Sequence, residues 1–411
     1  VHFFFVPYRQ VWDNFRKFCG EQEDPSDSTD YTIPQFRTQS ANWGEQSLGD
    51  YLGLPTKIQG VKCSVLPLRA YNHIYNEWYR DQNLIDSATV NKNDVDETSM
   101  SLYPVRKRGK RHDYFTSCLP WTQKGDSVTL PLGVSAPITT DASAENQLGL
   151  QINTDVKALY QTSSSSGLRY STNNLNSERL LYADLSEATA STVNELRRAF
   201  QIQKLLERDA RSGTRYSEIV SSHFGVRFLD VTYRPEYLGG SSSPLQTEAI
   251  PVTSTQNSYV GQYTGDLSAM GTITCQGGGF TKSFTEHGVV MGIASIRADL
   301  TYQQGMNRMW SRETKYDFYW PALAHIGEQA VLNKEIYYSG NTSQNEEVFG
   351  YQERWSEYRY KPSMITGKMR SNTTASLDAW HLSQEFSSLP QLNKDFIEEN
   401  KSKFSNEGLL F

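Results

Sequence analysis

The sequence predicts a mainly β protein, in which short antiparallel strands form a sandwich or barrel and long loops, some of them helical, connect the strands. Three features support this fold class. Short apolar runs bounded by Gly, Pro, Ser and Asn occur near both ends of the chain. Helical periodicity is confined to two separate segments. No internal repeat with a period of about 20 to 50 residues is visible, which argues against solenoids and propellers.

The predicted strands are rich in β-branched and aromatic residues, which suit a half-buried pleated surface. The first strand, HFFFVPY at 2–8, opens the chain, and SVTLPLGV follows at 127–134. Two later segments with strand composition are TITCQGGGFTKSF at 272–284 and HGVVMGIASIRADLTYQQG at 287–305. The long stretches between these segments are therefore expected to leave the sheets as excursions.

Two excursions are predicted to be helical. In 68–84, aromatic and apolar residues recur at steps of three and four and so share one face of a helix: Tyr71, Ile74, Tyr75, Trp78 and Tyr79. In 191–213, Thr192 and Glu195 have the spacing of a capping box, and Gly213 provides a C-terminal stop. The apolar stripe of this second helix consists of Val193, Leu196, Phe200 and Leu206.

The segment 134–180 differs from the rest of the chain in composition. It is rich in Ser, Thr, Asn and Gly, and it has no sustained helical or strand period. We expect an exposed insertion, which is either a functional surface or disordered. Tyr160, Leu168 and Tyr170 are the candidate apolar contacts within it.

Basic residues are concentrated in one short stretch of an acidic chain. The formal net charge is -6, from 40 Lys and Arg against 46 Asp and Glu, yet the sequence RKRGKR occupies 106–111. Aromatic residues follow this stretch closely, and cations with nearby aromatic rings suit phosphate contact and base stacking on single-stranded nucleic acid. A solvated turn, or salt bridges between subunits, is the alternative. The candidate phosphate contacts are Arg106, Lys107, Arg108, Lys110 and Arg111.

The four cysteines are scattered, without a CxxC pair or a His at ligand spacing. They are expected to be reduced thiols in a protein made in a cytoplasm. No apolar run of about 18 residues is present, so no membrane span is expected. The chain opens without an initiator Met or a signal peptide, and we expect an N-terminal portion to precede it.

No sequence pattern indicates catalysis. Nucleophile-elbow, phosphate-loop, dinucleotide-binding and zinc-protease motifs are absent from the sequence. The titratable groups His112–Asp113, Glu286–His287 and His325 show no catalytic spacing, because adjacent residues in a strand point to opposite faces. We therefore expect no enzyme, no catalytic residue, no cofactor and no metal ligand.

Several stretches resemble the major capsid protein of microviruses, and the gokushovirus-like group of small single-stranded DNA bacteriophages is the nearest branch. The matching stretches cover well over a third of the chain in order, and they are 2–22, 106–133, 196–226, 234–244 and 283–337. One of them contains RKRGKRHDYFTSCLPW, and another contains MWSRETKYDFYWP. Long ordered similarity of this kind is more specific than any short motif.

The resemblance implies a viral jelly roll, an eight-stranded antiparallel sandwich with long insertions. It implies pentamers and a T=1 icosahedral shell of sixty copies around circular single-stranded DNA. Scaffolding, DNA-packaging and minor capsid or pilot proteins, and a host receptor, are the further partners it implies. The virion is the expected location, after assembly in the bacterial cytoplasm. The segment 134–180 corresponds to the family's variable, outward insertion.

The expected organisation is one domain in three parts. Residues 1–133 and 181–411 form the two parts of the jelly roll, the second of them with a helical excursion at 191–224 and a C-terminal tail, and 134–180 lies between them. Aromatic residues of MWSRETKYDFYWP are expected to be core residues or intersubunit anchors: Trp310, Tyr316, Phe318, Tyr319 and Trp320. A β-sandwich carbohydrate-binding or adhesin-like protein is the alternative function, and a polysaccharide hydrolase has no positive support.

Overall fold

A computed structural model describes residues 1–129, 138–140, 148–152, 155–161, 168–174, 181–183, 193–227, 232–251, 267–275 and 277–398. The chain forms two compact units. One consists of Val1–Thr122 and Arg208–Phe411, and the other is Gln123–Glu207. The boundary between the units falls inside one long helix, Val193–Ser212.

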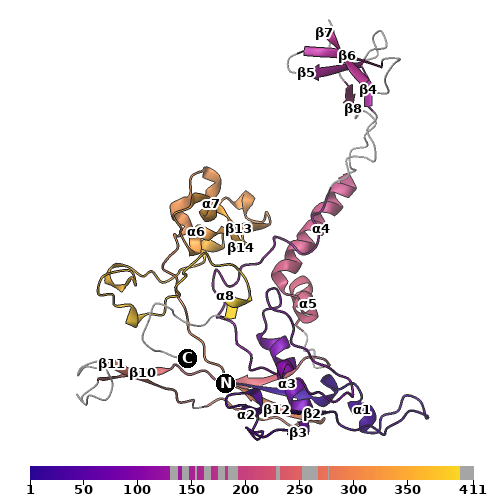
Figure 1. Ribbon diagram of the computed structural model, residues 1–411, viewed down its shortest axis with the longest axis vertical. Coiled ribbons are helices and arrows are strands. Elements are labelled where there is room, and N and C mark those ends of the chain that lie inside the picture. The colour runs from indigo at the N-terminus through magenta and orange to yellow at the C-terminus, as the bar shows by residue number, and fades with distance from the viewer. Residues whose placement is uncertain are drawn as a thin grey trace. The chain divides into compact units, whose positions relative to one another are not determined.

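The described strands pair into several small antiparallel sheets (Figure 1). In the first unit the sheets are β12-β1-β9, β10-β11, β13-β14 and β2-β3, and in the second they are β4-β8 and β5-β6-β7. The strands are β1 (His2–Pro7), β2 (Gln35–Arg37), β3 (Lys62–Ser64), β4 (Ile138–Thr140), β5 (Leu148–Ile152), β6 (Asp155–Gln161), β7 (Leu168–Asn174), β8 (Leu181–Ala183), β9 (Glu236–Gly240), β10 (Gln246–Pro251), β11 (Leu267–Thr272), β12 (Gly288–Ile293), β13 (Glu328–Leu332) and β14 (Val348–Glu353).

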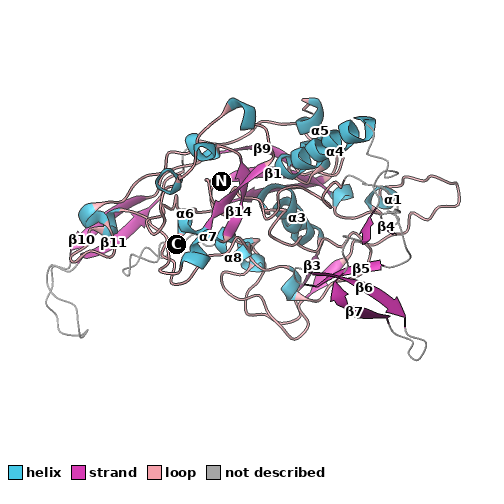
Figure 2. Cartoon of the chain, turned by 90° about the horizontal axis from the view of Figure 1, so that it is seen from above, coloured by secondary structure: helices cyan, strands magenta, loops and turns pink. Residues whose placement is uncertain are grey.

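The helices, cyan in Figure 2, are short apart from one, whose length can be seen in Figure 1. They are α1 (Phe15–Phe18), α2 (Leu48–Tyr51), α3 (Leu66–Ile74), α4 (Val193–Ser212), α5 (Tyr216–Phe224), α6 (Asn333–Ile336), α7 (Thr342–Glu346) and α8 (Lys394–Glu398). Among the helices of the described ranges, none is long and apolar enough to cross a membrane.

Strand β1 confirms the prediction for 2–8 and organises the first core. It lies between β12 and β9, with Phe4 opposite Met291 on one side and opposite Tyr237 on the other. Helix α3 packs against β1 and β12. The buried cluster joins these elements, because Phe4, Val6, Val11, Trp12, Leu66, Ala70, Ile74 and Met291 meet there.

The predicted helix at 68–84 is present, but its ends differ. It begins at Leu66 as α3, continues as a π-helical turn over Tyr75–Tyr79, and ends where Arg80 becomes extended. The Asp81 carboxylate accepts hydrogen bonds from the backbone N–H groups of Asn83 and Leu84, at 2.9 and 3.1 Å. An aspartate that binds the following backbone favours a turn over a helix, which explains why the helix ends early.

The predicted helix at 191–213 is confirmed as α4 from Val193 to Ser212, while 191–192 lie outside the described residues. Gly213 follows α4 with a φ of +105°, as the predicted stop requires. Helix α5 completes the excursion and ends at Gly225, which adopts the left-handed conformation.

A second core lies far along the chain from the first. Strands β13 and β14 and helix α8 pack on the segment 114–118, so residues more than 200 positions apart are in contact. The buried members are Ile85, Tyr114, Phe115, Cys118, Val331, Ile336, Phe349, Phe386, Phe396 and Ile397. A third core forms around Phe36, Trp43, Leu48, Val65, Leu68 and Tyr103.

Three segments differ from the strand predictions. The strand predicted over 287–305 is present only as β12, and 294–300 form no strand. A strand over 272–284 is wrong beyond Thr272, because Gly277 and Gly278 adopt positive φ values of 80° and 83°, which an extended strand does not. The segment 127–134 has no strand in its described part, and 130–134 lie outside the described residues. Within 134–180, the described residues form β4 to β7, although strand alternation there is too short to count as a sustained period.

All four cysteines are free thiols: Cys19 and Cys275 are exposed, Cys63 is intermediate and Cys118 is buried. Burial raises the pKa of Cys118 above its ordinary value.

The small antiparallel sheets support the mainly β class, but the described strands do not close into one sandwich.

A buried histidine predicts how stability depends on pH. His73 lies in α3 with its Nε2 2.8 Å from the carbonyl oxygen of Tyr233, and burial lowers its pKa to about 4. In the unfolded chain His73 binds a proton as pH falls below about 6.5, whereas in the folded chain it stays neutral until about pH 4. The free energy of unfolding therefore decreases as pH falls from 6.5 towards 4. The loss should reach about 3 kcal/mol by pH 4.

Urea unfolding of the wild-type chain and His73→Gln at several pH values measures this. The variant should lack that part of the acid loss, and an unchanged acid slope in His73→Gln would show that His73 is not the group responsible.

Candidate functional site

The basic stretch 106–111 is built largely into the fold of its own chain. The Arg106 guanidinium donates to Asn72 Oδ1 at 3.0 Å and to the Leu102 carbonyl at 3.3 Å. The Arg108 guanidinium donates to Ser295 Oγ at 2.7 Å and lies 5.1 Å from the Tyr79 ring centre. The contacts of Arg106 and Arg108 therefore hold the stretch against neighbouring parts of the chain.

Lys110 is buried, with an exposed fraction of 7%. Its ammonium donates to Gln384 Oε1 at 2.5 Å and lies 3.9 Å from the centre of the Phe396 ring. An ammonium buried between an amide oxygen and an aromatic face stabilises the docking of α8 on this stretch. It is not available at the surface.

Lys107 and Arg111 are the exposed members of the stretch. Arg111 forms a surface ion pair with Asp299 at 3.0 Å, in which both side chains are about two-thirds exposed. Such pairs contribute little and exchange readily with other partners. For Lys107, the described residues offer no hydrogen bond or ion pair. These two side chains can meet an external phosphate.

The aromatic residues predicted as core or intersubunit anchors are exposed on this chain, so the core interpretation is wrong for a single copy. Their exposed fractions are Trp310 71%, Tyr316 60%, Phe318 52%, Tyr319 52% and Trp320 49%. Local contacts hold the segment in shape: Trp320 Nε1 donates to the Lys315 carbonyl at 2.7 Å, and the Arg312 guanidinium lies over the Phe318 ring. The segment thus presents ordered aromatic rings outwards.

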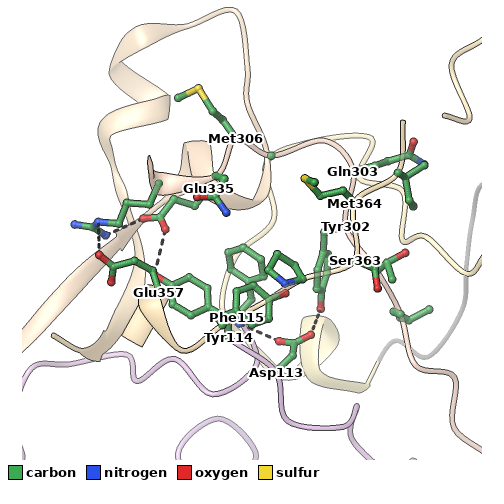
Figure 3. Close-up of a pocket in the computed structure, with 18 of the residues that line it drawn as sticks. Asp113, Tyr114, Phe115, Tyr302, Gln303, Met306, Glu335, Glu357, Ser363 and Met364 are labelled. Carbon is green, nitrogen blue, oxygen red and sulfur yellow. Dashed lines mark hydrogen bonds and ion pairs between the residues drawn. The ribbon is translucent and has the colours of Figure 1, made fainter. Parts of the chain in front are cut away.

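Beside this segment the first unit contains a cavity of about 640 Å³ (Figure 3). Its walls come from the segment 113–115, from 299–310 and from 360–366, with Glu335 and Glu357 on one side. The Asp113 carboxylate accepts from the Tyr302 hydroxyl at 2.9 Å and also from backbone and side-chain groups of Thr116. The carboxylates of Asp113 and Glu335, both labelled in Figure 3, accept hydrogen bonds from tyrosine hydroxyl groups, so neither is a free acid or base on the cavity wall.

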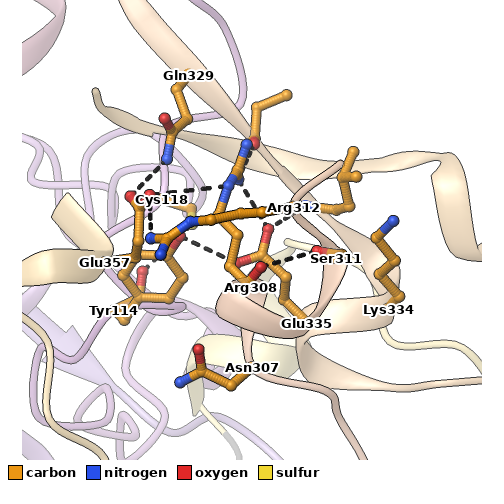
Figure 4. Close-up of polar contacts among 12 residues, drawn as sticks. Tyr114, Cys118, Asn307, Arg308, Ser311, Arg312, Gln329, Lys334, Glu335 and Glu357 are labelled. Carbon is orange, nitrogen blue, oxygen red and sulfur yellow. Dashed lines mark hydrogen bonds and ion pairs between the residues drawn. The ribbon is translucent and has the colours of Figure 1, made fainter. Parts of the chain in front are cut away.

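Two arginines and two glutamates form an ionic cluster in which Arg308, Glu335 and Glu357 belong to the cavity wall (Figure 4). Arg308 lies 2.9 Å from Glu335 and 3.9 Å from Glu357, and Arg312 lies 3.7 Å from Glu357. Glu335 also accepts from the Tyr114 hydroxyl at 3.1 Å and from the Leu332 backbone at 3.0 Å. Burial raises the pKa of Glu335, and the Arg308 charge opposes that rise.

Sequence reasoning missed this cluster, because its members come from separate parts of the chain. The helical turn of α6, with its capping arrangement between Leu332 and Glu335, was the only local signal. Among the described residues, no group of three or more His, Cys, Asp or Glu side chains is arranged to hold a metal ion. The pairs that the sequence suggested do not act together, since Glu286 pairs with Arg9 and Asp113 with Tyr302.

Half of the tryptophans lie at the surface. Of the eight in the chain, Trp78, Trp310, Trp320 and Trp380 are exposed. Tryptophan is rarely left in water, and it is enriched where proteins meet partners. Exposed tryptophans of this kind are typical of a protein that contacts other macromolecules.

Comparison with known proteins identifies that protein class more closely. The chain belongs to the family described as capsid protein (F protein), which matches residues 1–405. It is 46% identical over 415 residues to the capsid protein VP1 of Bdellovibrio phage phiMH2K, covering 97% of this chain and 77% of that protein.

Two other relatives agree. The chain is 38% identical to the capsid protein VP1 of Chlamydia phage 1, over 97% of this chain and 80% of that protein. It is 37% identical to the capsid protein VP1 of Spiroplasma virus 4, over 97% and 77% respectively. The resemblance to microvirus capsid proteins is therefore confirmed. The chain is a major capsid protein of the small single-stranded DNA phages, a self-assembling structural component of the virion and not an enzyme.

Proposed function

We propose that this chain folds as a viral jelly roll and that sixty copies, through pentamers, close a T=1 shell around circular single-stranded DNA. Membership of the capsid protein (F protein) family supports this proposal. The small antiparallel sheets and long connections agree with a sandwich that has large insertions. In this organisation, 1–133 and 181–411 contribute the two parts of the jelly roll, and 134–180 is the insertion between them.

The observation that carries the proposal is the exposed aromatic segment. Trp310, Tyr316, Phe318, Tyr319 and Trp320 lie within one ordered stretch, each about half exposed or more. We take them to be intersubunit anchors, because a few buried aromatic residues supply most of the binding energy of a protein interface. A shell needs only modest energy per contact, since each copy is held by several neighbours.

We further propose that the stretch 106–111 faces the packaged DNA. Arg106, Arg108 and Lys110 fix its backbone through contacts within the chain, while Lys107 and Arg111 reach phosphates. Attraction of Lys and Arg to phosphates is independent of sequence, which suits the packaging of a whole genome.

The insertion 134–180 is proposed to be the outward surface that contacts the host receptor. Tyr160 lies in β6, and Leu168 and Tyr170 lie in β7; their side chains are outside the description. Scaffolding, DNA-packaging and minor capsid or pilot proteins are proposed as further partners, with assembly in the bacterial cytoplasm.

The DNA proposal predicts a specific loss. Particles with Lys107→Gln and Arg111→Gln should assemble normally but retain less DNA as salt rises. With two phosphate contacts gone, the salt dependence of single-stranded DNA binding should fall by about 1.4 in log–log slope. DNA per particle, from absorbance at two wavelengths after nuclease treatment, measures the effect.

The matched control replaces Lys57 and Arg359, which are about equally exposed cations in surface pairs elsewhere, by Gln. Normal DNA content and an unchanged salt slope in the Lys107 and Arg111 variant would refute the assignment of this stretch to DNA.

A further inference from the structure

Residues 361–380, between β14 and α8, form a small lobe with an unusual surface. Met364 and Trp380 are 86% and 79% exposed, the largest fractions among the large hydrophobic side chains of the described residues. Met369 and Leu377 are exposed as well. Four large apolar side chains on one short segment are more than a solvated loop normally carries.

The lobe is held in a fixed conformation by hydrogen bonds across its base. The Leu377 N–H donates to the Lys368 carbonyl at 2.9 Å, and the Ser376 hydroxyl donates to the Arg370 carbonyl at 2.9 Å. His381 Nε2 lies 2.6 Å from the Met369 carbonyl. These links join the two halves of the segment, so its apolar side chains are displayed by an ordered support.

The lobe is also tied to the rest of the first unit. Gln303 donates to Ser371 Oγ at 2.8 Å and accepts from the Ser371 backbone at 3.2 Å, and Ile365 is a buried member of the lobe. Met364 forms part of the cavity wall and lies across the cavity from Glu335 in Figure 3. Because the lobe is ordered before any partner arrives, docking on it would cost little conformational entropy.

We propose that the 361–380 lobe is an intersubunit clasp, docking through Met364 and Trp380 on a second copy of the chain in the assembled shell. The inference rests on the self-assembly of the chain, and it adds a contact separate from the aromatic segment 310–320. A rigid lobe bearing methionine, leucine and tryptophan has the composition of an interface core, and burial of these side chains is the favourable term.

Charge favours a second copy as the partner. The lobe carries Lys361, Lys368 and Arg370 against Asp378, a net charge of +2, whereas the chain as a whole carries -6. The rest of the chain therefore carries a net negative charge, and opposite net charges attract the lobe to a neighbouring copy. DNA is the less suitable partner, because Met364 and Leu377 cannot stack on bases and the Arg370 guanidinium donates to the Gln303 carbonyl at 3.3 Å.

The direct test is a photo-cross-link in intact particles. With Trp380 replaced by p-benzoylphenylalanine, illumination should join two copies of the chain, and mass spectrometry should map the joined peptide to another copy. The same illumination of dissociated chains should give no joined pair. Cross-linking to DNA, to a different phage protein, or to nothing in intact particles would overturn the clasp.

A second test uses Met364→Ser with Trp380→Ser, which should lower the yield of sedimenting particles at least about tenfold. The circular dichroism spectrum of the chain should not change, because both side chains are exposed. Tyr51→Ser, an exposed aromatic in α2, is the matched control and should leave the yield unaltered. If the wild-type chain forms particles and the double variant gives the same particle yield, the clasp is refuted and the proposed shell is not. If the wild-type chain itself forms no particles, the proposed shell is refuted.

Discussion

Glu97→Ala should lower the free energy of unfolding by about 3–5 kcal/mol, because it strands a buried cation. Arg69 is fully buried, and its guanidinium donates to Glu97 at 2.9 Å and to the Asn93 carbonyl at 3.0 Å. The Tyr103 hydroxyl donates to the same carboxylate at 2.6 Å. Removing the carboxylate therefore leaves the buried Arg69 charge without its counter-ion and the Tyr103 hydroxyl without its acceptor.

Urea unfolding followed by tryptophan fluorescence reports on this region, since Trp12 and Trp43 are buried close to it. Glu45→Ala is the matched control: that carboxylate forms an ion pair in which both side chains are 72% exposed, and its loss should change stability little. The combined variant Arg69→Met with Glu97→Leu should lose less than Glu97→Ala alone, since it leaves no unpaired charge. Equal losses in the two variants would contradict the stranded-cation explanation.

Arg308→Leu should lower stability by about 2–4 kcal/mol near neutral pH. Its side chain is a quarter exposed, so the loss is smaller than for a fully buried pair, but it pairs with Glu335 and lies beside Glu357, which are 4% and 9% exposed. Without Arg308, the Glu335 carboxylate loses the positive charge that most strongly opposes the effect of burial, and its pKa rises further.

The sign of the pH effect follows from that rise. A carboxyl group with a raised pKa in the folded state favours folding below its unfolded value, near 4.5, and the benefit disappears as pH rises through the folded value. The deficit of Arg308→Leu relative to wild type should therefore shrink towards pH 4. Arg359→Leu, from the exposed pair with Glu353, serves as control. A deficit that is the same at pH 4 and pH 7 would contradict this assignment.

Local patterns predicted the local elements of this fold. The strand β1 follows from an apolar run bounded by Pro7, and α4 follows from its apolar stripe and the glycine after it. Both depend on neighbours in sequence, which is why their positions are close to those predicted. The predicted end of the 68–84 helix was wrong, because the apolar period continues past the residue at which the helix stops. The hydrogen bond from the Asn83 backbone to the Asp81 side chain favours a turn there.

Contacts between distant residues could not be predicted. Lys110 contacts Gln384 and Phe396, which lie far along the chain. The run of cations at 106–111 therefore predicts a surface patch, although one of its members is buried in a core. Composition also cannot tell a core aromatic from an interface aromatic, since both bury the same groups. Trp310 and Trp320 were therefore ambiguous in sequence, and their exposure on the single chain supports their proposed place at an interface.

Electron microscopy of the expressed chain, combined with its sedimentation, tests the central claim most directly. If the exposed aromatic surface and the jelly-roll fold build a shell, the images should show closed isometric particles of sixty copies, and the chain should sediment as those particles or as pentamers. A chain that remains folded but sediments as a monomer or dimer at every concentration, with no rings or shells in the images, would contradict the account.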